Sequence, residues 1–180
     1  MNIHDNVKEG ESYSPIYKSI LENQSADNNT ALIIDDERVI RKVVAKKLQN
    51  IAPKLKKYEA GNGKEGLETL AMIRRTHNRD PLLIVLDLNM PVINGWDFIA
   101  KMKKEYENAG KSIGIPIIVL SSTSGEKGTL FLKKSVLGGK SGYIPLATVA
   151  KESCVKKTAY DAKDGEGLEA WLKYFIDAND

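Results

Sequence analysis

The chain has 180 residues, of which 42% are hydrophobic and 28% charged, and its formal net charge is +3. This length and balance are typical of one soluble globular domain with a single core. Its apolar stretches are too short to cross a bilayer, and the first residues lack the charged and apolar blocks of a signal peptide. The single cysteine, Cys154, cannot form an internal disulfide. We therefore expect a cytoplasmic protein without membrane contacts, and the diffuse charge does not favour a nucleic-acid partner.

The first part of the chain differs in composition from the rest. Residues 1–29 are rich in Asn, Ser, Asp and Glu and carry two lysines against five acids, which leaves about +6 for the remainder. This composition predicts a flexible N-terminal arm over 1–29, followed by one domain over 30–180.

From residue 31 onward, short apolar runs alternate with segments of helical periodicity. The predicted strands are 31–35, 57–60, 82–86 and 115–120, and apolar residues mark helices within 40–51, 67–73 and 98–106. A last amphipathic helix is predicted around 168–176.

This alternation predicts an α/β fold with a doubly wound, five-stranded parallel sheet, provided that a fifth strand lies after residue 137. The segment 138–163 holds more chain than one strand and one loop need, so we expect an extra segment there. The apolar residues around 130–137 lie on more than one face of a predicted fourth helix, which suggests either a partner surface or a wholly buried helix.

Acidic residues follow two of the predicted strands. Asp35 and Asp36 come directly after one apolar run, and Asp87 comes directly after another. Open α/β sheets place their ligands at the carboxyl ends of the strands, and converging carboxylates repel one another unless a cation lies between them. The pattern therefore predicts a Mg²⁺ site used in phosphoryl chemistry. The competing interpretation, that Asp35 and Asp36 cap a helix, does not account for Asp87.

Three motifs on successive strands resemble the response regulator receiver domain of two-component signalling. They are Leu32-Ile33-Ile34-Asp35-Asp36-Glu37, Val85-Leu86-Asp87-Leu88-Asn89-Met90-Pro91-Val92-Ile93-Asn94-Gly95 and Ile115-Pro116-Ile117-Ile118-Val119-Leu120-Ser121-Ser122. The resemblance runs from about residue 31 to 176. It implies the flavodoxin-like (βα)5 receiver fold, with strand order 2-1-3-4-5.

The resemblance also implies roles for individual residues. Asp87 matches the acceptor that becomes an aspartyl phosphate. Asp36 matches a direct Mg²⁺ ligand and Asp35 a ligand through water, whereas Asn89 matches the residue whose backbone carbonyl completes the metal shell. Ser121, whose neighbour Ser122 could be confused with it, matches the hydroxyl that binds a phosphoryl oxygen.

The family also has a lysine on its fifth strand, and two alignments compete for it. One places the strand at Gly142–Leu146, where Tyr143 matches the family's switch aromatic but no lysine follows. The other places it at Ser153–Thr158, where Lys157 supplies the ammonium and the aromatic is lost, with Lys156 as its neighbour. Because a phosphoryl group needs cationic partners, we favour Lys157.

The leading functional hypothesis is a stand-alone response regulator without turnover activity. It would accept a phosphoryl group on Asp87 from a histidine kinase or phosphotransfer protein, and would signal through contacts with a downstream protein. The alternatives are a phosphorylation-independent receiver-like adaptor, which the absence of a lysine would favour, and a phosphatase with an aspartyl nucleophile.

Overall fold

The computed structural model describes residues 30–111, 114–121, 146–151, 168 and 172. Four of its strands lie within two residues of the predicted positions. The elements, in chain order, are β1 (Thr30–Ile34), α3 (Arg38–Ile51), β2 (Lys56–Ala60), α4 (Gly63–His77), β3 (Leu83–Asp87), α5 (Gly95–Asn108), β4 (Ile117–Ser121) and β5 (Leu146–Ala150).

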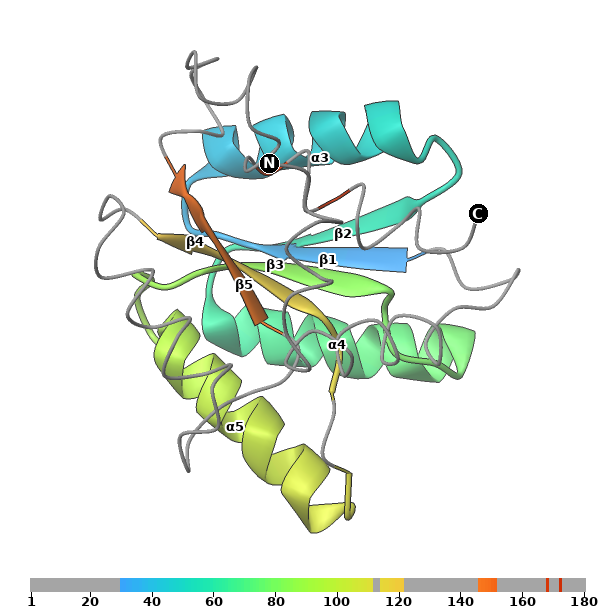
Figure 1. Cartoon of the computed structure of the whole chain (residues 1–180), viewed down its shortest axis with the longest axis vertical. Coiled ribbons are helices and arrows are strands. Elements are labelled where there is room, and N and C mark those ends of the chain that lie inside the picture. Colours follow the sequence, from blue (N-terminus) through green and yellow to red (C-terminus); the bar gives the residue numbers. More distant parts are fainter. Residues whose placement is uncertain (1–29, 112–113, 122–145, 152–167, 169–171, 173–180) are drawn as a thin grey trace, which may run out of the picture.

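The five strands form one parallel sheet with the order β2-β1-β3-β4-β5. Helix α3 covers one face of this sheet, and α4 and α5 cover the other (Figure 1). The order reverses between β1 and β3, which is where doubly wound sheets bind their ligands. The predicted fold class is therefore confirmed.

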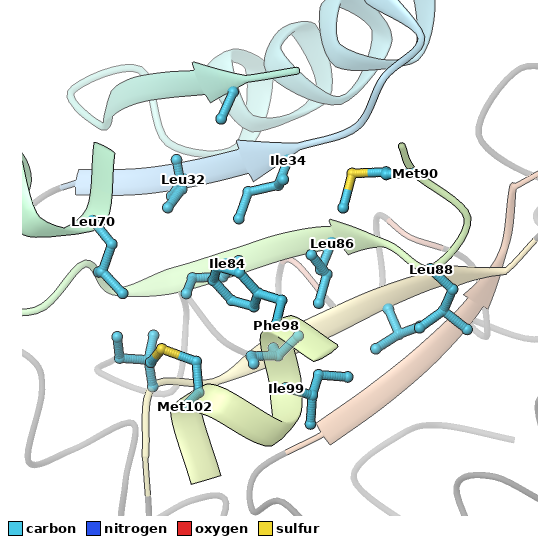
Figure 2. Packing of buried hydrophobic residues seen from close by; sticks show 14 of the residues in the cluster. Leu32, Ile34, Leu70, Ile84, Leu86, Leu88, Met90, Phe98, Ile99 and Met102 are labelled. Carbon is cyan, nitrogen blue, oxygen red and sulfur yellow. The ribbon is translucent and has the colours of Figure 1, made fainter. Parts of the chain in front are cut away.

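Two hydrophobic cores, one on each face, hold the helices against the sheet. Every residue of β1 and β3 is buried, as expected for strands covered on both sides. Successive side chains point to opposite faces, so Ile33 packs with α3 whereas Leu32 and Ile34 pack toward α4 and α5. Figure 2 shows this second core, in which Phe98 of α5 lies against the β3 side chains.

The N-cap residues of the helices show whether Asp35 or Asp36 caps a helix. Asn62 caps α4 by accepting a hydrogen bond from the amide of Glu65, and Asn94 caps α5 in the same way. Helix α3 is preceded by Glu37, which makes no side-chain cap. Neither Asp35 nor Asp36 therefore occupies the cap position of α3, and the capping interpretation of the acid pair is wrong.

The fifth strand lies between the two predicted positions. It spans Leu146–Ala150 and pairs in parallel with β4. Both predicted positions for the fifth strand, Gly142–Leu146 and Ser153–Thr158, are therefore wrong, although the first shares Leu146 with it. The first alignment followed Tyr143 and the second followed Lys157, whereas the strand beside β4 contains two alanines and a threonine and is followed directly by Lys151.

Several other predictions can be compared only in part. Leu168 and Leu172 are helical and buried in the same core as α3, in agreement with a last helix. The arm over 1–29, the fourth-helix region at 130–137 and most of the extra segment at 138–163 lie outside the described residues. Among the described helices, none has the length and hydropathy needed to span a membrane.

Candidate functional site at the carboxyl edge of the sheet

Four strands of the sheet deliver polar residues to one edge. Asp35 directly follows β1, Asp87 is the last residue of β3, Ser121 is the last residue of β4, and Lys151 directly follows β5. Because all the strands are parallel, these positions are at their carboxyl ends. The edge is the one predicted for the ligand site.

The three predicted acids come together there. Carboxylate oxygens of Asp35, Asp36 and Asp87 all lie within 4.8 Å of one another. Asp35 and Asp87 are almost fully buried, with 0% and 1% of their surface exposed, whereas Asp36 is exposed. The cluster is therefore open to solvent on the side of Asp36 and closed beneath Asp35 and Asp87.

Among the residues that the structure describes, Lys151 supplies the positive charge that pairs with these carboxylates. Its Nζ atom lies 3.2 Å from an oxygen of Asp35, 3.2 Å from Asp87 Oδ2 and 2.6 Å from Glu37 Oε1. The side chain is only 11% exposed. Sequence reasoning missed Lys151 and chose Lys157, which lies outside the described residues together with Tyr143.

Burial and charge together set the protonation of the site. Burial and the charge of Asp35 raise the pKa of Asp87 to about 6, because together they outweigh the opposing effects of the Lys151 ammonium and the Asn89 amide. Burial also raises the pKa of Asp35, against the opposing effects of the Glu37 amide and Lys151. Burial alone would lower the pKa of Lys151, but its hydrogen bond with Glu37 and the charges of Asp35 and Asp87 outweigh it and raise the pKa.

Backbone groups fix the carboxylates of Asp35 and Asp87. The amide of Glu37 donates to Asp35 Oδ1 at 2.7 Å, and the amide of Asn89 donates to Asp87 Oδ1 at 3.3 Å. The loop after β3 folds back closely, because the amide of Gly95 donates to the carbonyl of Leu88 at 2.9 Å. A Cβ atom at Gly95 would stand 2.3 Å from the Asp87 carbonyl, so this position needs glycine.

The residues present fit a hard divalent cation. Asp35 Oδ2 is buried and accepts no hydrogen bond from the described residues, although the Lys151 ammonium lies 3.2 Å from it. A buried carboxylate oxygen with spare acceptor capacity, next to an exposed carboxylate, suits Mg²⁺, which keeps several waters and takes only a few protein oxygens. The Asn89 amide donates to Asp87, and Ser121 ends β4 at the same edge of the sheet, opposite Ala150 in β5.

Comparison with known proteins agrees with this architecture. The sequence model of the family described as Response regulator receiver domain matches residues 31–136. The nitrate/nitrite response regulator protein NarL of Escherichia coli is 34% identical over 116 residues, which are 64% of this chain and 46% of NarL. A protein-glutamate methylesterase/protein-glutamine glutaminase of Treponema pallidum is 33% identical over 115 residues, 64% of this chain and 26% of that protein. The chain thus spans less than half the length of these curated relatives.

Solved structures support the same fold. The receiver domain of a DNA-binding response regulator from Colwellia psychrerythraea superposes with a TM-score of 0.56 at 18% identity, covering 83% of this chain and 99% of that one. The Francisella response regulator 1452 receiver domain gives a TM-score of 0.52 at 22% identity, covering 85% and 100% of the two chains. At these identities the likeness concerns the fold.

Proposed function

The chain belongs to the response regulator receiver domain family, and we propose that it accepts a phosphoryl group on Asp87 in a Mg²⁺-dependent reaction. The donor would be a histidine kinase or a histidine phosphotransfer protein. Phosphorylation would then change the contacts that the domain makes with a downstream protein. Signalling of this general kind is common to the family.

The environment of Asp87 carries the proposal. Its carboxylate ends a buried strand at the ligand-binding edge of the sheet, beside two further acids and within 3.2 Å of the Lys151 ammonium. Asp87 is buried and paired with Lys151, but it also adjoins the exposed carboxylate of Asp36, where the cluster is open to solvent. This combination of a buried nucleophile, a cation and an exposed neighbouring carboxylate suits transfer of a dianionic group.

The reaction follows from the positions of these groups. An oxygen of Asp87 attacks the phosphorus atom of the donor, a new O–P bond forms, the P–N bond to histidine breaks, and the histidine nitrogen keeps the electron pair. Asp87 must be ionised to attack, which its pKa of about 6 permits at neutral pH. The Asn89 amide, 3.3 Å from Oδ1, holds the carboxylate in place.

The remaining groups balance charge. A Mg²⁺ ion held by Asp35, Asp36, Asp87 and the Asn89 carbonyl would neutralise the transferred phosphoryl oxygens. Lys151 would take the role that sequence reasoning gave to Lys157, since its ammonium already lies beside Asp87. Ser121 would donate its hydroxyl to a phosphoryl oxygen from the end of β4.

The output of the domain is also a proposal. We favour signalling through protein contacts without turnover, because the described residues contain the receiver site and no second catalytic motif was found in the sequence. The methylesterase relatives are matched over only a part of their length, so their activity is not transferred to this chain.

A phosphodonor experiment tests the function directly. The full chain is incubated with acetyl phosphate and Mg²⁺, and intact mass spectrometry counts the phosphoryl groups. We expect one group on wild type, none on Asp87→Asn, and one on Asp97→Asn, which removes an exposed acid from the first turn of α5. Equal labelling of wild type and Asp87→Asn would reject Asp87 as the acceptor. Absence of labelling from both would favour the phosphorylation-independent adaptor, and continuous release of phosphate would favour an enzyme.

A further inference from the structure

We propose that Arg41 is a positioning residue that holds the Asp35-Asp36 backbone in its metal-binding conformation and so sets the affinity for Mg²⁺. This inference rests on the proposed function of the acid cluster. It assigns a role to a cation of α3 that does not itself contact the three carboxylates in the described structure.

Arg41 joins three elements through one guanidinium group. Its Nη1 atom donates to the backbone carbonyl of Asp35 at 2.6 Å, and its Nε atom donates to Glu59 Oε2 of β2 at 3.1 Å. The side chain is only 16% exposed. A planar guanidinium can serve two acceptors in fixed directions, which a lysine ammonium cannot reproduce with the same geometry.

The bond to Asp35 acts where the chain leaves the sheet. The amide of Asp35 donates to the carbonyl of Ala60 at 3.1 Å, so this residue is still tied to β2 on its amino side. On its carboxyl side, the carbonyl is tied to Arg41. That carbonyl belongs to the peptide plane that leads into Asp36. Fixing this plane restrains the backbone at Asp36, from which its exposed carboxylate reaches the cluster.

Glu59 holds the guanidinium in turn. Its two oxygens are divided between Arg41 and Lys42, each at 3.1 Å. Burial alone would raise the pKa of Glu59, but the hydrogen bonds from Lys42 and Arg41 outweigh it and lower the pKa. The carboxylate is therefore a charged anchor for Arg41, and the chain of contacts runs from β2 through Arg41 to the acid pair.

Charge and geometry make opposite predictions for the loss of Arg41. Removing a cation near a metal site strengthens Mg²⁺ binding by simple electrostatics. Removing a group that orients the ligands weakens binding, typically by about 10-fold or more. The sign of the change in affinity therefore separates a positioning role from a purely electrostatic one.

The experiment is a Mg²⁺ titration of the full chain, in which the amide chemical shifts of residues 35–37 report binding. Arg41→Gln is expected to raise the dissociation constant by about 10-fold. Arg41→Lys keeps the charge but cannot donate to both Glu59 and the Asp35 carbonyl in the same directions, and is expected to weaken binding as well. Lys46→Gln removes an exposed cation from the same helix and should leave the constant within about twofold of wild type.

Phosphorylation by acetyl phosphate supplies a second readout. If Arg41 acts through metal affinity, the defect of Arg41→Gln should disappear at saturating Mg²⁺, whereas a folding defect would persist. Unchanged or tighter Mg²⁺ binding by Arg41→Gln, while Asp36→Ala abolishes it, would overturn the role of Arg41 and leave the metal site standing. An equal Mg²⁺ response in wild type and Asp36→Ala would instead overturn the metal site and, with it, this inference.

Discussion

Replacing Asp87 by Asn should stabilise the protein at neutral pH in the absence of Mg²⁺. The carboxyl of Asp87 has a pKa of about 6 in the folded protein against 3.8 for the ordinary group. A difference of about two pKa units corresponds to about 3 kcal/mol of unfolding free energy. Asn has nearly the same shape without the charge, and Lys151 keeps Asp35 and Glu37 as partners.

The pH dependence of this gain has a defined sign. Because the folded pKa lies above the unfolded one, the folded state binds the proton more tightly. The stability of wild type that comes from this group is therefore present below about pH 4 and lost as the pH rises through about 6. The advantage of Asp87→Asn should be largest above pH 7 and should shrink toward zero as the pH approaches 4.

Urea unfolding at pH 7.5 and pH 4.5 measures the effect. In a thermal scan at pH 7.5, the same gain of about 3 kcal/mol would raise the melting temperature by roughly 6 to 12 °C in a chain of this size. Asp97→Asn is the control and should lose up to about 1 kcal/mol, because it removes a negative charge from the start of a helix. An Asp87→Asn variant that is no more stable than wild type at pH 7.5, or equally favoured at both pH values, would refute the reasoning.

Three further outcomes are expected. At subsaturating Mg²⁺, the rate of phosphorylation should fall as the pH drops through about 6, because Asp87 must be ionised both to bind the ion and to attack; a rate that does not change between pH 5 and 8 under these conditions would contradict an Asp87 nucleophile with a raised pKa. Asp36→Ala should abolish the Mg²⁺ response in a titration, yet change the unfolding free energy by only about 0.5 kcal/mol because Asp36 is exposed. Lys151→Met should lower the unfolding free energy by about 3 to 5 kcal/mol at pH 7.5, since two buried carboxylates lose their cation. A larger loss of stability from Lys157→Ala than from Lys151→Met in the same urea experiment would contradict the assignment of the site cation to Lys151.

The acid cluster could be predicted because its signals are local. Each strand that carries an acid is a continuous apolar run, and the carboxylates stand directly at its end, as with Ile34 and Asp35 in β1 or Leu86 and Asp87 in β3. Parallel pairing then brings these ends together without further information from the sequence. The sheet order followed from the family resemblance and is now confirmed.

The lysine could not be located in the same way. Lys151 is 64 residues from Asp87, and its position depends on the pairing of β5 with β4. The β5 run, Leu146–Ala150, contains two alanines, which are depleted in strands, so it produced a weaker signal than the continuous Ile, Leu and Val runs of β3 and β4. A short run of small residues that is followed at once by a lysine was the available clue. The Arg41 contact with the Asp35 carbonyl was equally hidden, because side-chain bonds to a backbone carbonyl leave no pattern in the sequence.

The site and the fold make opposing demands on the same residues. Asp35 and Asp87 are buried with raised pKa values, so their charges destabilise the folded chain, and Lys151 only partly offsets this. The fully buried apolar strands β1 and β3, packed on both faces, supply the stability that tolerates the cluster. An ionised Asp87 is nevertheless what attack on phosphorus requires. Substitutions that neutralise the buried carboxylates Asp35 and Asp87 should therefore gain stability and lose phosphorylation together, whereas a receiver-like adaptor that never binds phosphate would have no reason to keep these charges buried.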